Sequence, residues 1–263
     1  MEIIDTHVHI YPDAIAQKAA DAIGQFYDIA IHKNGTLASL LQSGMEGGIR
    51  RFLIHSVATT PKQVESINRY LQGVGQAHPE ECIPFGTMHP GYENIPEELQ
   101  RMKQGGLRGV KVHPDFQKFL LDSDEAMHMF RCIADAGLPV LIHMGDYRYP
   151  YSEPQRMAKV LEAFPDLRVI GAHLGGWTIW KEAWKTLSKY NNFWVDTSSS
   201  LMFLTPEESA EIIRKYAPDH VFFGSDYPMW DPAEEVQRFM ALPLTDEEKE
   251  NILGKNFTRF IGR

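Results

Sequence analysis

Short runs of apolar, mostly β-branched residues recur along the chain, separated by longer stretches with helical spacing. Eight such runs predict strands at 3–9, 51–56, 83–88, 109–113, 139–144, 168–173, 193–196 and 221–226. Several of them are apolar at consecutive positions, which is typical of parallel strands covered on both faces. Strands that alternate with helices in this way predict an α/β fold with a parallel sheet.

Capping residues and glycines mark the helix boundaries. A Ser, Thr or Asp with Glu or Gln three positions later predicts helix starts at Thr60, Ser152, Thr205, Asp231 and Thr245. Glycines, which relieve left-handed strain at helix ends, precede the second, fourth and fifth strands at 47–48, 105–106 and 137. The long stretch 10–48 predicts an extra helical segment over the site, acting as a lid or as a contact between copies of the chain.

Eight strands with intervening helices are the number that closes a (β/α)8 barrel, the TIM barrel. The 263 residues, 43% of them hydrophobic, are enough for a single domain over 1–263, and we see no linker or repeat that divides them. The alternative is a doubly wound open sheet. We disfavour it because no glycine-rich dinucleotide motif follows the first strand, and because an open sheet would scatter the polar strand ends.

Net charge limits the classes of binding partner, and cysteine content indicates the redox state of the compartment. The formal net charge of -9, without any basic block, argues against nucleic acid and against an anionic membrane, and leaves a small-molecule substrate. Cys82 and Cys132 lack metal-binding or redox spacing, so we expect reduced thiols and a cytoplasmic protein. A homodimer is one option for the oligomeric state, which the sequence does not specify.

Polar residues end several of the predicted strands. His7 and His9 lie two positions apart in the first strand, so their side chains point to the same face. His143, His173 and Asp226 stand at the ends of the fifth, sixth and eighth strands. A barrel brings these ends round one axis and makes the eighth strand the neighbour of the first. Because imidazoles with a carboxylate suit zinc and its first-row neighbours, the sequence predicts a metal site.

The loops after the strands hold the candidates for substrate contact, because ligand pockets of such barrels are built there. Lys111 and His113 share a face of the fourth strand. Lys111 would supply positive charge to the substrate or to the surroundings of Asp226, or else form a structural ion pair. Arg148 is the candidate anchor for a substrate carboxylate because its guanidinium has fork geometry. Aromatic candidates, which suggest a flat or apolar substrate unless they only pack the loops, are Tyr147, Trp177 and Trp230.

Four segments carry a resemblance to a known family: DTHVH at 5–9, GVKVHP at 109–114, GSDYP at 224–228 and ILGKN at 252–256. Over nearly its whole length the chain resembles the amidohydrolase superfamily, in the amidohydrolase-related (amidohydrolase 2) branch with enzymes similar to aminocarboxymuconate semialdehyde decarboxylase. The resemblance implies a distorted (β/α)8 barrel and one divalent ion held by His7, His9, His143 and Asp226. Zinc is the first expectation for that ion, with manganese, iron, cobalt and nickel as alternatives.

The resemblance also bears on the lysine and on the reaction. Some superfamily members bridge two metals with a carbamylated lysine, but the Lys-x-His-Pro pattern at Lys111 is similar to that of the mononuclear branch. We expect a hydrolase in which a metal-activated water attacks an ester, lactone or amide, with Asp226 transferring the proton. His173 would lie beside that water and orient it or stabilise the oxyanion. The alternative is a metal-dependent, non-oxidative decarboxylase of an unsaturated or aromatic acid.

Overall fold

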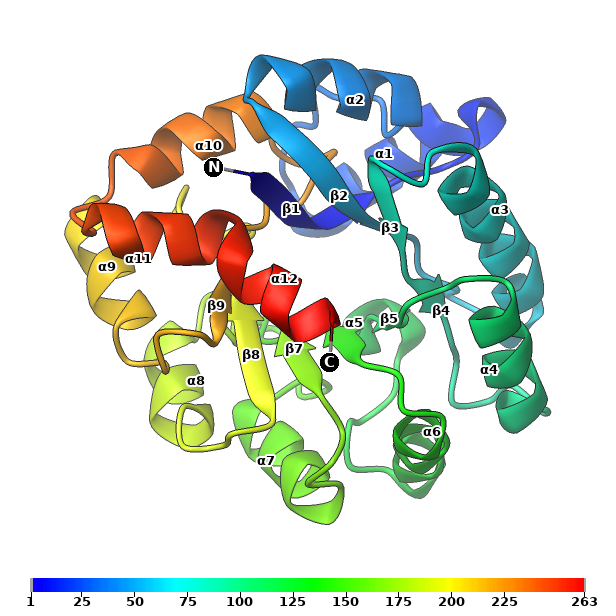
Figure 1. The fold of residues 1–263 in the computed structure, drawn as a ribbon. Coiled ribbons are helices and arrows are strands. Elements are labelled where there is room, and N and C mark those ends of the chain that lie inside the picture. The colour runs from blue at the N-terminus through cyan, green and yellow to red at the C-terminus, as the bar shows by residue number, and fades with distance from the viewer. Residues whose placement is uncertain (1, 263) are drawn as a thin grey trace.

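In the computed structural model, which describes residues 2–262, parallel strands surround a central axis and helices form the outer layer (Figure 1). The strands are β1 (Ile3–His9), β2 (Ile49–His55), β3 (Cys82–Pro84), β4 (Gly86–Thr87), β5 (Val110–Val112), β6 (Val140–Ile142), β7 (Val169–Gly171), β8 (Phe193–Asp196) and β9 (Val221–Phe222). The α-helices are α1 (Asp13–Tyr27), α2 (Leu37–Glu46), α3 (Val64–Ala77), α4 (Ile95–Gln104), α5 (Pro114–Gln117), α6 (Asp124–Asp135), α7 (Pro154–Ala163), α8 (Trp180–Leu187), α9 (Pro206–Ile213), α10 (Pro232–Met240), α11 (Asp246–Glu250) and α12 (Asn256–Ile261). A short 3₁₀ helix, η1 (Pro61–Gln63), precedes α3, and a π-helix, η2 (Asn251–Lys255), joins α11 to α12.

The predicted α/β barrel is confirmed, with its third strand divided. β3 pairs with β2 and β4 pairs with β5, so the hydrogen-bonded orders are β1-β2-β3 and β4-β5-β6-β7-β8-β9, all parallel. Phe85 lies at the break, and its backbone N–H still donates to the carbonyl of Ile54 at 3.0 Å. At the other seam, the backbone N–H of Thr6 donates to the carbonyl of Phe223 at 2.9 Å. The barrel is therefore closed and distorted, as expected.

One end of the barrel is filled by apolar side chains. Phe257 and Phe260 of α12 join the buried cluster inside the barrel, and both rings contact Phe222 of β9 at centroid distances of 5.4 and 5.3 Å. Figure 1 shows α12 crossing this end of the barrel. Buried aromatic rings contribute strongly to the stability of a protein core, so we assign this end of the barrel to stabilising the fold. The polar side chains gather at the opposite end, where the strands finish.

Most of the predicted helix signals are confirmed. Thr205 and Thr245 form capping boxes, and the side chain of Asp231 caps α10. Ser152 is an exception, because Glu153 precedes α7 and the Ser152 hydroxyl donates to Asp115 instead, at 2.9 Å. Glycines 48, 106 and 137 have positive φ, as a helix exit before a strand requires.

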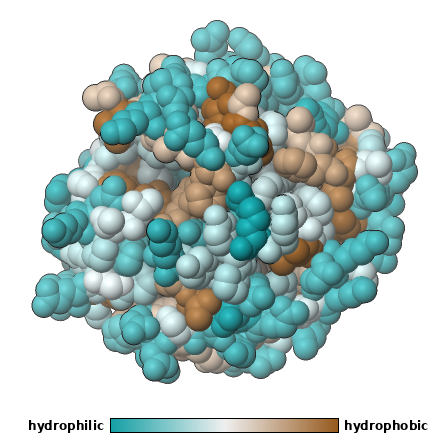
Figure 2. Space-filling view, turned by 180° about the vertical axis from the view of Figure 1, so that it is seen from behind, coloured by the Kyte–Doolittle hydropathy of each residue, from teal (hydrophilic) through white to brown (hydrophobic). Residues whose placement is uncertain are grey.

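The stretch between β1 and β2 contains two helices. α2 packs against β2 and α10 as part of the outer layer, whereas α1 is the predicted extra segment. The hydroxyl of its last residue, Tyr27, reaches the strand ends and lies 3.0 Å from Nε2 of His113. Within residues 2–262, no helix is long and apolar enough to span a bilayer. Seen from behind, the surface is largely hydrophilic with hydrophobic side chains exposed in places (Figure 2).

Candidate metal centre

Two histidines of β1 and one aspartate after β9 lie together at the end of the barrel. His7 and His9 point to the same face, and their Nε2 atoms lie 3.2 and 3.4 Å from Oδ1 of Asp226. The backbone N–H of Asp226 donates to the carbonyl of His7 at 2.8 Å, which fixes the loop after β9 to β1. All three side chains are buried. Strand alternation and barrel closure thus bring together residues more than 200 positions apart in the sequence.

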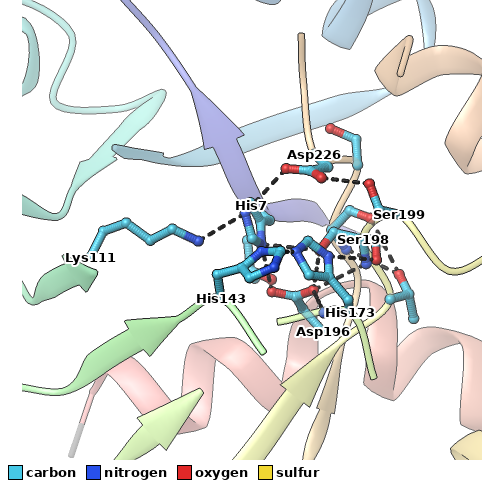
Figure 3. A network of polar contacts seen from close by, with 12 residues as sticks. His7, Lys111, His143, His173, Asp196, Ser198, Ser199 and Asp226 are labelled. Atoms are coloured by element: carbon cyan, nitrogen blue, oxygen red, sulfur yellow. Dashed lines mark hydrogen bonds and ion pairs between the residues drawn. The ribbon is translucent and has the colours of Figure 1, made fainter. Parts of the chain in front are cut away.

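A carboxylate behind His7 fixes the tautomer of its ring. Nδ1 of His7 lies 2.8 Å from Oδ2 of Asp196, at the end of β8 (Figure 3). The other oxygen of Asp196 accepts from the backbone N–H groups of His173 and Ser198, each at 3.1 Å, and from the Ser198 hydroxyl. Because a carboxylate only accepts, Nδ1 of His7 carries the hydrogen and Nε2 keeps a lone pair.

The same reasoning fixes His173 and His143. Nδ1 of His173 lies 3.0 Å from the carbonyl of Ser198, which only accepts, so this nitrogen carries the hydrogen. Burial lowers the pKa of His173 to about 4, so the ring is neutral and its Nε2 is an acceptor. That Nε2 lies 2.9 Å from Nδ1 of His143, which must donate. The remaining nitrogen of His143, Nε2, therefore keeps a lone pair that could bind a metal ion, with the Tyr27 hydroxyl 3.5 Å away.

These lone pairs fit a bound cation. Nε2 of His7 and Oδ1 of Asp226 are both acceptors, yet they lie only 3.2 Å apart. Burial lowers the pKa of His7, which favours the neutral ring with its lone pair on Nε2. Two lone pairs that face each other in a buried site repel, and a cation bound between them would remove this repulsion. The donor types match those that zinc, manganese and related ions prefer.

The described residues contain three groups of three whose ligand-type atoms lie within 4.8 Å of one another: His7, His9 and His55; His7, His173 and Asp196; and His113, Asp115 and His143. The predicted set of four is not one of these groups, but its histidines belong to them and Asp226 contacts two of those histidines. The structure thus provides candidate ligands in the predicted region. The choice of His7, His9, His143 and Asp226 among them stays a prediction.

Lys111 is the cation nearest to this cluster. Its Nζ lies 3.1 Å from Nε2 of His7, and the side chain is fully buried on β5 (Figure 3). Burial lowers the pKa of Lys111 to about 8, against the opposing effect of Asp226 and Asp196. A lysine with this pKa is still mostly protonated at pH 7, so it offsets part of the carboxylate charge.

Aromatic rings cover the cluster. The ring of His143 stacks on that of His113 at 3.8 Å and 8°, and His113 stacks on Phe116 at 3.7 Å and 6°. The hydroxyl of Tyr27, at the end of α1, lies 3.0 Å from Nε2 of His113 and 3.5 Å from Nε2 of His143. These side chains, with Asp226 and His9, line a cavity of about 10 Å³, which holds roughly one water molecule.

The predicted substrate contacts have diverse surroundings. Of these residues, His113 lines the cavity, whereas Arg148 binds Asp146 with two nitrogens and also donates to the Phe26 carbonyl at 3.0 Å. Tyr147 is 75% exposed. Nε1 of Trp230 donates to the Ser199 hydroxyl, which in turn donates to Asp226, and Trp177 packs against Tyr27. Their roles toward a substrate stay predictions, and Arg148 would have to leave Asp146 to bind a carboxylate.

Sequence reasoning missed several residues of this cluster. Asp196 ends a predicted strand just as Asp226 does, and that position was the signal that could have identified it. His55 also ends a strand, β2. In the structure its ring lies 4.8 Å from that of His7 and 4.3 Å from that of His9, and neither of its nitrogens has a hydrogen-bond partner within residues 2–262. No sequence signal pointed to Tyr27.

Replacing Asp196 with asparagine is expected to weaken metal binding by about 10- to 100-fold. The amide oxygen would keep the donors of Ser198 and His173, so the NH₂ group would face Nδ1 of His7 and force the hydrogen onto Nε2. A competition titration with a fluorescent chelator measures the affinity, and Asp166→Asn, on the exposed surface, is the control. An unchanged affinity in a folded Asp196→Asn protein would show that this carboxylate does not orient His7.

Comparisons with known proteins agree with the fold. A family model described as Amidohydrolase matches residues 4–263. No curated protein matches the chain. An uncharacterized TIM-barrel protein of Bordetella bronchiseptica is 21% identical, with a TM-score of 0.82 over 100% of both chains.

Two other similar structures are named as decarboxylases. The 5-carboxyvanillate decarboxylase of Sphingomonas paucimobilis is 17% identical, with a TM-score of 0.78 over 99% of each chain. A dihydroxybenzoic acid decarboxylase of Polaromonas sp. JS666, which holds manganese and the inhibitor 2-nitroresorcinol, is 14% identical, with a TM-score of 0.75 over 99% of this chain and 97% of that one. At these identities the likeness establishes a common fold.

Proposed function

Because the chain belongs to the amidohydrolase family, we propose that it is a metal-dependent carboxy-lyase that removes carbon dioxide from an aromatic or unsaturated acid. The sequence alone favoured hydrolysis, and decarboxylation was the alternative. Two solved structures of the same fold support the alternative, since they are named as decarboxylases of substituted benzoic acids. Hydrolysis of an ester, lactone or amide becomes the second candidate.

The observation that carries the proposal is an aromatic stack that lines the cavity beside Asp226. His143, His113 and Phe116 form a nearly parallel stack, and all three line the same cavity as Asp226. A planar conjugated acid can lie against an outer face of such a stack once the cavity of about 10 Å³ widens. Conjugation matters to the reaction because the electron pair left on carbon must be delocalised when the bond to the carboxylate breaks.

The residues of the cluster would have three roles in this reaction. His7, His9, His143 and Asp226 would hold a divalent ion, which when bound supplies positive charge to a substrate oxygen. Lys111 adds a buried positive charge beside His7, which favours an anionic substrate. The bond between the substrate carbon and its carboxylate breaks, carbon dioxide leaves, and the carbon gains one proton. Asp226 lines the cavity and relays that proton from solvent to the carbon.

The test is a product analysis with the manganese-loaded protein in deuterated water. Hydroxybenzoic and unsaturated acids labelled with ¹³C at the carboxylate are incubated beside a panel of lactones, esters and amides. We expect labelled carbon dioxide and one deuterium at the carbon that carried the carboxylate. Hydrolysis of a lactone, ester or amide without any release of carbon dioxide would replace this proposal with the second candidate.

A further inference from the structure

A long groove runs beside the metal centre and belongs to neither the cavity nor the barrel core. Its volume is about 810 Å³, within the range of about 300–1,000 Å³ that is usual for pockets of drug-sized ligands. One wall is a face of α1 that includes Ile15, Ala19 and Ala22, at spacings of three and four. The opposite wall is a face of α3 with Ser66, Ile67 and Tyr70.

The groove meets the metal centre at one place. His9, Ile23 and Phe116 line both the groove and the small cavity, so these three side chains form the partition between them. The cavity holds roughly one water molecule and is too small for a whole acid. A substrate whose carboxylate reaches the cluster past Ile23 and Phe116 must therefore leave the rest of its body in the groove.

The side chains that line the groove favour a ligand whose groove-bound part is apolar. Ile15 is 51% exposed on the surface of α1, and Ile67 and Tyr70 of α3 are only partly buried, so the two walls offer apolar area to a ligand. The groove is also lined by the buried Asp115, whereas its two exposed charged side chains are Lys18 and Lys118, both cationic. Their charge favours the entry of an anionic molecule into a chain whose net charge is -9.

Resting on the proposed function, we propose that the substrate is an aromatic acid with a long apolar arm. The carboxylate end lies at the metal centre, and the arm, an alkyl chain or a second ring on the far side of the first ring, lies in the groove between α1 and α3. Ile23 and Phe116 move apart to let the carboxylated ring pass. Single-ring acids without an arm fill only the inner part of this site.

The test is a binding experiment that needs no turnover. Isothermal titration calorimetry compares benzoate with 4-hexylbenzoate on the manganese-loaded protein. We expect the hexyl compound to bind about tenfold or more tightly, because each buried methylene contributes favourably to binding. Ala22→Trp fills the groove from α1 and Ser66→Trp fills it from α3, and each should abolish the difference. Ala14→Trp, an exposed position of α1 outside the groove, should preserve it.

The outcomes separate the groove from the reaction. Equal affinities of the two acids for the unmodified protein would overturn the proposal, as would a hexyl advantage that survives in both groove variants. If the hexyl advantage depends on the groove but no acid loses carbon dioxide, the groove binds an apolar acid and the proposed reaction is wrong. If single-ring acids are decarboxylated and the hexyl advantage is absent, the reaction stands and the groove proposal fails.

Discussion

Turnover of the Asp226→Asn protein is expected to fall by about 10²- to 10⁴-fold, the usual loss when a group that transfers a proton is removed. Asparagine cannot relay a proton to carbon, and it also removes the negative charge that faces Nε2 of His7 at 3.2 Å. The backbone tolerates the change, because φ at this position is 66° and asparagine adopts left-handed backbone more readily than most residues. Initial rates with the best acid from the product screen measure the effect.

Two measurements keep this result interpretable. Thermal unfolding of both proteins after removal of the metal ion should show that Asp226→Asn is as stable as the unmodified protein, since the amide still accepts a hydrogen bond from Ser199. Asp166→Asn, which makes the same chemical change on the exposed surface, should keep full activity. Turnover close to normal in Asp226→Asn would remove Asp226 from the proton transfer, whichever reaction the protein catalyses.

Removal of the metal ion is expected to abolish turnover and to lower the unfolding temperature. Without a divalent ion, Nε2 of His7 and Oδ1 of Asp226 are two acceptors at 3.2 Å with only Lys111 beside them. An ion present at a thousand times its dissociation constant stabilises the folded state by about 4 kcal/mol, and this contribution disappears on chelation. Dialysis against a chelator, followed by activity and unfolding measurements before and after addition of Mn²⁺ or Zn²⁺, tests the prediction.

The number of ions per chain distinguishes a site with one ion from a site with two. Mass spectrometry of protein purified without chelators should find about one divalent ion per chain, as expected for a four-ligand site with an uncarbamylated Lys111. About two ions would instead indicate that Lys111 bridges them as a carbamate. Full activity and an unchanged unfolding temperature in metal-free protein would refute the metal centre.

The barrel itself was predictable because its signals are local. Apolar runs of strand length, capping residues such as Thr205 and glycines with positive φ such as Gly137 act within a few residues of each other. The division of the third strand at Phe85 was not predictable, since it depends on which neighbour each half pairs with. The role of Ser152 was not predictable for the same reason, because its hydroxyl donates to Asp115, which is distant in sequence, and does not cap α7.

The sequence by itself determined the closed parallel barrel and the polar side chains that meet at its strand ends, because strand alternation makes His7 and His9 share a face and barrel closure brings Asp226 beside them. Only the tertiary structure decided which hydrogen each imidazole carries, because that depends on Asp196 and on the Ser198 carbonyl, contributed by other strands. It also decided that α1 covers the cluster through Tyr27 and forms a groove with α3. These contacts depend on the relative placement of segments distant in sequence, which local patterns do not encode.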